Sequence, residues 1–217
     1  MERKELIKRY IIFIIGLFFS ALGVALTKSA GLGISPISSV ANVMNARFDA
    51  VSIGTWLIVW NCLLILGQVL ILRKQFRIVQ LLQIPLSFLF GWFTDFGVWA
   101  VGRIPVPNYP VRIVLVILGT AVLGFGIALA VIANVILNSG EAFVKAIADT
   151  AHKPFGNVKI CFDIACVLTA VVLSLCFFHG KIVGTREGTV LAALLTGTTV
   201  KLFTRPLKAP LERFLKH

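Results

Sequence analysis

The chain has 217 residues, of which 58% are hydrophobic and only 14% are charged, and its mean hydropathy is +0.95. This composition excludes a water-soluble globular protein and is typical of a polytopic membrane protein. The formal net charge of +12 does not indicate nucleic-acid binding, because lysines and arginines cluster at the ends of apolar runs and no base-reading motif is present.

Six apolar runs predict membrane-spanning helices, since a hydrocarbon core of roughly 30 Å needs about 20 apolar residues per helix. They cover residues 10–27, 51–72, 78–94, 113–135, 160–178 and 188–200. The last run is short and crosses only if Lys201 and Arg205 extend their side chains to the membrane surface. Pro85 lies inside the third run and predicts a kink there, because proline removes a backbone donor.

Two shorter segments, residues 34–45 and 139–151, follow the first and fourth runs. If both crossed the membrane, the chain would have eight spans. We expect six spans and two short helices that enter the membrane or lie buried in protein, because both segments are too short to cross and the second carries Glu141, Lys145 and Asp149. These three residues share one helical face, where two ion pairs or a solvated surface would suit them.

The distribution of positive charge predicts the orientation of the chain. With six spans, most lysines and arginines of the loops fall on the same side as the basic amino terminus. Because positively charged loops stay in the cytoplasm, we expect both termini there.

The two halves of the chain repeat the same order of features. At an offset of 103 residues Gly16 aligns with Gly119 and Gly23 with Gly126, and at nearby offsets the aligned pairs are Gly54 with Gly156, Asn61 with Asp163, and Gly91 with Gly197. A duplication with three spans in each half produces copies that face opposite ways, as in many secondary transporters. We therefore predict one transmembrane domain over residues 1–217, with a first repeat at 8–105, a second at 106–205 and a basic cytoplasmic tail at 206–217.

The sequence also resembles a known family. The stretch ALTKSAGLGISPISS at residues 25–39, together with GTREGTVLAALLTG at residues 184–197, is similar to the bacterial YczE/YyaS/YitT-type integral membrane proteins, and the similarity runs over nearly the whole chain. The resemblance implies a multi-pass protein of the bacterial cytoplasmic (inner) membrane. It supplies no catalytic residues.

The starts of the two short segments are the first candidate site. Gly31 and Gly33 permit backbone shapes closed to other residues, Ser35 suits a helix N-cap, and Pro36 suits the first helical position. Asn138 or Ser139 would cap the second segment. If the two helices enter from opposite faces, their amino ends present free N–H groups to a polar or anionic solute. The alternative is an ordinary helix start at the membrane surface.

Polar residues inside the apolar runs extend this site. A carboxylate at a helix centre costs about 2.5 to 3.5 kcal/mol on insertion scales, so Asp163 should face protein or water, as a coupling site for a proton or cation or as an interfacial residue. The substrate-binding residues that we predict are Ser35, Ser38, Ser39, Asn42, Asn61, Asn138, Ser139, Glu141 and Asp163.

These features favour a transporter that moves a small polar or anionic solute by alternating access around a midplane site. The alternatives are a substrate-capturing subunit that needs an energising partner, and an accessory protein that does not transport. We expect no enzyme, cofactor or metal site, because no nucleophile and base are paired and the histidines lack ligand spacing. The expected partners are the lipid bilayer, a small-molecule solute and a coupling proton or cation, and the oligomeric state is left open.

Overall fold

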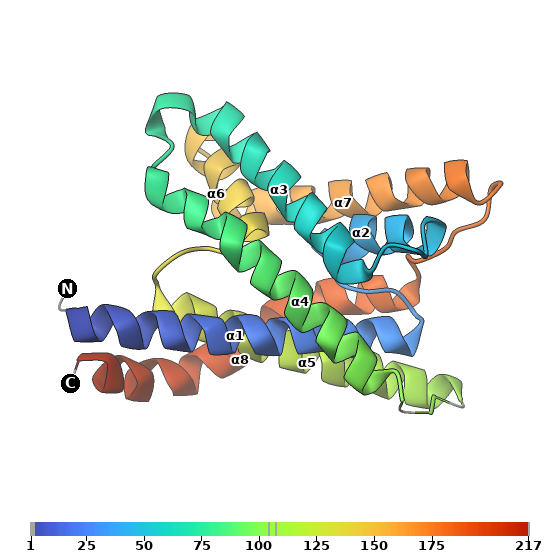
Figure 1. The fold of residues 1–217 in the computed structure, drawn as a ribbon, viewed down its shortest axis with the longest axis horizontal. Coiled ribbons are helices and arrows are strands. Elements are labelled where there is room, and N and C mark those ends of the chain that lie inside the picture. Colours follow the sequence, from blue (N-terminus) through green and yellow to red (C-terminus); the bar gives the residue numbers. More distant parts are fainter. Residues whose placement is uncertain (1–2, 104, 107, 217) are drawn as a thin grey trace.

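The computed structural model describes residues 3–103, 105–106 and 108–216, and these residues form helices without any strand. Two 3₁₀ turns, η1 and η2, connect the third and fourth α-helices (Figure 1). The elements are α1 (Arg3–Ala30), α2 (Pro36–Arg47), α3 (Ile53–Leu72), η1 (Arg73–Gln75), η2 (Ile78–Leu82), α4 (Gln83–Val101), α5 (Tyr109–Ala133), α6 (Ser139–Ala151), α7 (Phe155–Phe177) and α8 (Glu187–Lys216).

Five of these helices are long and apolar enough to cross a membrane: α1, α3, α4 with its preceding 3₁₀ turn, α5 and α7. The helix α8 is not among them. It is a single helix of 30 residues whose first part is apolar and whose second part carries Lys201, Arg205, Lys208 and Arg213. The chain is therefore a multi-pass helical protein with five candidate spans.

An antiparallel pair, α1 and α5, forms the centre of the fold. A β-carbon built on Gly16 would lie 2.6 Å from the Gly126 carbonyl oxygen, and one on Gly23 would lie 2.6 Å from the Gly119 carbonyl oxygen. The residue numbers at these contacts increase along α1 while they decrease along α5, so the two helices run in opposite directions. Only glycine allows backbones to approach this closely. The amino end of α1 and the carboxyl end of α8 lie at the same end of the molecule (Figure 1).

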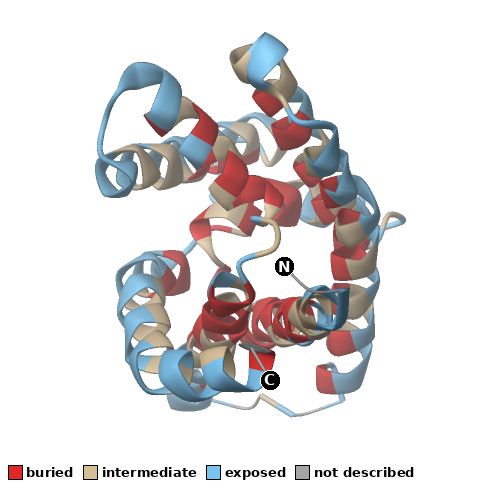
Figure 2. Ribbon diagram, turned by 90° about the vertical axis from the view of Figure 1, so that its left-hand side faces the viewer, coloured by how far each residue is buried: buried red, intermediate tan, exposed pale blue. Residues whose placement is uncertain are grey.

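The other helices pack around this pair in a crossed pattern. The helix α4 packs along α1 and α8 along α5, while α2 packs on α7 and α6 packs on α3. The two short helices meet at their first turns, since a β-carbon on Gly140 of α6 would lie 2.9 Å from Cδ1 of Ile37 of α2. Buried residues follow the inner faces of the helices and exposed residues the outer faces (Figure 2).

The outer surface of the molecule is apolar. Large hydrophobic side chains are exposed on most of the long helices, among them Leu70, Trp92, Leu168 and Leu194. A soluble monomer rarely exposes so much contiguous apolar surface, whereas a bilayer covers it. The burial pattern thus agrees with the composition.

Three predicted details differ from the structure. Pro85 does not kink a helix, because α4 begins at Gln83 and Pro85 lies in its first turn, where a missing backbone donor is tolerated. The short helix α2 begins at Pro36, two residues later than residue 34, whereas α6 has the predicted bounds. Residues 206–216 are not a separate tail but continue α8, with Pro206 and Pro210 inside the helix.

Asp95 of α4 accepts two hydrogen bonds from the start of α3. Its Oδ2 accepts a hydrogen bond from the Ser52 hydroxyl at 2.6 Å, and its Oδ1 accepts one from the Gly54 backbone N–H at 2.8 Å. Asp95 therefore satisfies donors at the start of α3 that would otherwise lack a partner.

Asp95→Ala should lower the free energy of unfolding by about 1–3 kcal/mol, because it leaves these donors unpaired at a helix junction. Thermal unfolding of the purified protein in detergent measures this change. Asp49→Ala is the control, since Asp49 is exposed and should leave the melting temperature unchanged. Equal shifts in the two variants would contradict a bridging role for Asp95.

Candidate functional site

The candidate site is the place where the first turns of α2 and α6 meet. The chain turns back into α2 through Gly31 and Gly33, whose φ angles are +69° and +101°. It turns into α6 after Asn134, which is left-handed with φ 49°. Ser35 and Asn138 are the N-cap residues, as predicted, but neither side chain caps its helix. The first turns of both helices therefore keep backbone N–H groups that no capping side chain occupies.

Three serines line the α2 side of this meeting point. The Ser35 hydroxyl donates to the Ser38 hydroxyl at 3.1 Å. The Ser39 hydroxyl donates to the Pro36 carbonyl at 2.6 Å and lies 3.4 Å from the carbonyl oxygen of Cys166 on α7. Ser38 and Ser39 are buried. The predicted serine cluster is thus a buried polar surface at the amino end of α2.

Polar side chains of α3 and α4 form hydrogen bonds with the first turn of α6. The Ser139 hydroxyl lies 3.2 Å from the Ser87 hydroxyl, and the Ser139 carbonyl accepts a hydrogen bond from Gln68 Nε2 at 3.2 Å. Gln68 and Gln83 exchange two hydrogen bonds of 3.1 Å through their amides. Because all of these groups are buried, the amino end of α6 is held rigidly against α3 and α4.

Glu141 in the first turn of α6 borders a small, partly open cavity of about 30 Å³, which is room for one water. Asn138 of the same turn and Ser20 of α1 share this cavity. The Glu141 Oε2 atom is buried and has no hydrogen-bond partner among the described residues. Burial raises the pKa of the Glu141 carboxyl, with Lys159 and Asp163 as the nearby charges.

Asp163 does not present a free carboxylate to the site. Lys159, one turn earlier on α7, lies 2.5 Å from its Oδ1 and 2.6 Å from its Oδ2. The pair is partly buried. This ion pair satisfies the Asp163 carboxylate within α7, so the structure does not place Asp163 among the groups that are free to bind a solute.

Two predicted residues lie elsewhere. Asn42 accepts a hydrogen bond from Lys28 Nζ at 3.0 Å and donates to the Gly184 carbonyl at 2.7 Å. Asn42 therefore joins α1, α2 and the loop before α8. It lies outside the site, because seven residues of helix place it about 10 Å from Ser35. Asn61 is buried on α3, where its Nδ2 has no partner among the described residues.

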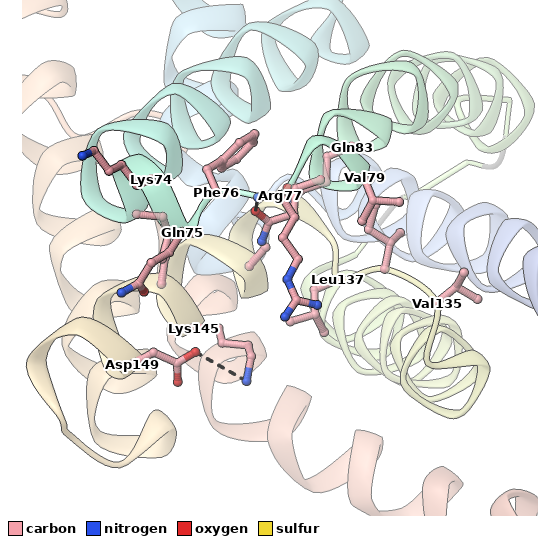
Figure 3. A pocket seen from close by; sticks show the side chains of 15 residues that line it. Lys74, Gln75, Phe76, Arg77, Val79, Gln83, Val135, Leu137, Lys145 and Asp149 are labelled. Carbon is pink, nitrogen blue, oxygen red and sulfur yellow. Dashed lines mark hydrogen bonds and ion pairs between the residues drawn. The ribbon is translucent and has the colours of Figure 1, made fainter.

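A larger hollow opens beside α6. This vestibule, of about 780 Å³, lies between the 3₁₀ turns, residues 135–137 and α6. In Figure 3, Arg77 extends from the turns toward Leu137, and Lys145 and Asp149 form a loose ion pair of 3.7 Å on α6. Lys74 adds a further positive charge, so the vestibule is basic overall. Gln83 belongs both to its wall and to the network around Ser139.

The two halves of the molecule differ in how closely two of their helices cross. A β-carbon on Gly91 would lie 2.7 Å from the Gly54 carbonyl oxygen, so α3 and α4 cross in close contact. The residues that the sequence repeat aligns with them, Gly156 and Gly197, have nothing within 4 Å of a built β-carbon. Within the described residues no comparable packing joins α7 and α8.

A protein-family model described as a family of unknown function, DUF6198, matches residues 7–205. The chain belongs to the DUF6198 family. The match spans both short helices and most of every long helix of this DUF6198 protein, and it does not name the YczE/YyaS/YitT type, which stays a resemblance. No curated protein and no solved structure matches the chain.

Several residues that position the site in this DUF6198 protein are absent from our sequence-based set. They are Gln68, Gln83, Ser87 and Lys159. The signal for the first three was present, because amides and hydroxyls within apolar runs need partners when a helix is buried. Lys159 was recognisable by its spacing of four residues from Asp163 on one helix.

Proposed function

We propose that this DUF6198 protein is a transporter of the bacterial cytoplasmic membrane that moves a small polar or anionic solute by alternating access of two inverted repeats. In this proposal α8 is the sixth span and both termini are cytoplasmic. The observation that carries it is the contact between the first turns of α2 and α6, at Ile37 and Gly140.

The contacts of α1 and α5 support the inverted repeat. The repeat aligns Gly16 with Gly119 and Gly23 with Gly126, and a two-fold rotation would exchange the contact of Gly16 with Gly126 for that of Gly119 with Gly23. The packing of α2 on α7 would likewise be exchanged for that of α6, the aligned helix, on α3. Since α1 and α5 are antiparallel, this axis would run across them, in the plane of the membrane.

The chemistry of the meeting point favours a polar or anionic solute. Helix amino ends carry partial positive charge and free N–H donors, which bind anions and polar oxygens. Serine hydroxyls surround both ends. The basic vestibule would raise the local concentration of anions on the side that faces the termini.

Alternating access needs two conformations. In this proposal they differ in which of two helix crossings is close, that of α3 with α4 or that of α7 with α8. The close contact of Gly54 with Gly91 then corresponds to a closed side, and the open surroundings of Gly156 and Gly197 correspond to an open side. In the opposite state the repeats would exchange these arrangements. A carrier built from two equivalent halves needs no other moving part.

Cysteine cross-linking of the purified protein in liposomes tests this proposal, in a variant from which Cys62, Cys161, Cys166 and Cys176 have been removed. The pair Ser52→Cys and Asp95→Cys should cross-link at once, because these two side chains already meet across the crossing of α3 and α4 at 2.6 Å. The repeat aligns them with Pro154 and Lys201, which are exposed. The pair Pro154→Cys and Lys201→Cys should also cross-link, more slowly, as molecules visit the opposite state. Single-cysteine variants are the controls for cross-links between molecules.

A rigid accessory protein would give a different result. Cross-linking of the first pair alone would overturn the proposed function. If the second pair reacts in cell membranes but never in the purified protein, the alternation depends on another component, as expected for a substrate-capturing subunit with an energising partner.

A further inference from the structure

Glu141 is a half-buried acid that forms no ion pair among the described residues. Its carboxyl oxygen Oε2 is buried and has no hydrogen-bond partner there, although solvent reaches part of the side chain. It lies at the amino end of α6, in the cavity that Asn138 and Ser20 also line. The other acid near it, Asp163, is held by Lys159.

The surroundings of Glu141 determine its charge. The residues that share its cavity from α1 and α5 carry no titratable group, and α3 faces the same turn with the Gln68 amide. On α7 the charges of Lys159 and Asp163 largely cancel each other. On α6 itself, Lys145 pairs with Asp149. Burial costs an ionised Glu141 much of its hydration, and this cost outweighs the attraction of Lys159 and of the Glu141 backbone N–H, so the neutral carboxyl is favoured.

An ionised Glu141 would also occupy the site. A carboxylate in the first turn of a helix is itself an anion that the free N–H groups attract. It would therefore compete with an anionic solute, whereas the neutral carboxyl leaves the N–H groups to the solute. Enclosing the ionised form between the two repeats would carry the full desolvation penalty of a charge.

We propose that Glu141 is the proton-carrying residue of transport, and that the two repeats exchange their arrangements only when its carboxyl is protonated. This inference rests on the proposed function. The O–H bond forms with a proton taken from water on the side that is open, and it breaks on the opposite side after the exchange. Because the return exchange also requires the neutral carboxyl, a proton accompanies the exchange in each direction, and protonation permits transport without a net transfer of protons.

The pH dependence of cross-linking tests this inference. In the cysteine-free parent with Pro154→Cys and Lys201→Cys, the rate of cross-linking should fall about tenfold per pH unit above the pKa of the carboxyl. The rate is divided by that of the Ser52→Cys and Asp95→Cys pair, which corrects for the reactivity of the thiols. Adding Glu141→Gln, which mimics the neutral carboxyl, should make this ratio independent of pH.

The matched control is Glu187→Gln, since Glu187 also lies in the first turn of a helix but is exposed. It should keep the pH dependence of the parent. Formation of the cross-link between positions 52 and 95 in the Glu141→Gln protein shows that this variant is folded. An unchanged pH dependence in Glu141→Gln would overturn the inference and leave the proposed function intact, whereas a second pair that never reacts would overturn the proposed function itself.

Discussion

Gly23→Leu should unfold the centre of the protein, with a loss of about 3 kcal/mol in the free energy of unfolding. A β-carbon at this position would lie 2.6 Å from the Gly119 carbonyl oxygen and 2.7 Å from the Leu123 α-carbon. These are backbone atoms of α5, which can move aside only if the two central helices separate. We expect a markedly lower melting temperature and aggregation on size-exclusion chromatography.

The control for this variant is Gly197→Leu, which makes the same change at a glycine with nothing within 4 Å. Its melting temperature should stay at that of the parent. The comparison separates the effect of a close helix crossing from the general effect of a larger side chain in an apolar helix. A stable Gly23→Leu protein, or equal losses in both variants, would contradict the packing of α1 on α5.

A disulfide between cysteines at positions 52 and 95 should prevent the formation of one between positions 154 and 201 in the same molecule. In the proposed function the two crossings close in different states, and in this structure only the crossing of Gly54 and Gly91 is close. In a variant with all four substitutions, mass spectrometry of proteolytic fragments after oxidation should find molecules with either disulfide and none with both. Reduction should restore the exchange.

Molecules that carry both disulfides would show that the crossings are independent. The four single-cysteine variants exclude pairing between neighbouring molecules as the source of a signal. This experiment requires no knowledge of the solute, since it follows the shape of the protein alone.

The helical architecture was predictable because the signals are local. Composition and apolar runs predicted a multi-pass helical protein, and the N-caps Ser35 and Asn138 marked where the short helices begin. The glycines that the repeat matches on α1 and α5 lie in the contact between these two helices. The expected kink at Pro85 was wrong, because sequence alone did not show that the apolar run starts with a 3₁₀ turn.

The candidate site was predictable only in part. Ser35, Ser38, Ser39, Asn138, Ser139 and Glu141 do lie around the meeting point of the short helices. Asn42 was included because it lies in the same short segment, but distance along the helix separates it from the site. The amide pair of Gln68 and Gln83 depends on the packing of α3 against α4, which no single apolar run encodes.

The difference between the two helix crossings was beyond sequence reasoning for another reason. The repeat places small residues at Gly54, Gly91, Gly156 and Gly197 alike, so the sequence permits close crossings in both halves. Which crossing closes is a property of a conformation, and a sequence that supports two conformations specifies neither alone.

The pairing of α1 with α5 also bears on biosynthesis. The ribosome completes α2, α3 and α4 before it begins α5 at Tyr109, so the glycine face of α1 must remain against lipid or the insertion machinery until then. Long-range contacts of this kind form late and leave early segments unprotected. A nascent chain that stops after α4 would lack the surface that buries Gly16 and Gly23, and we expect quality-control proteases to remove it.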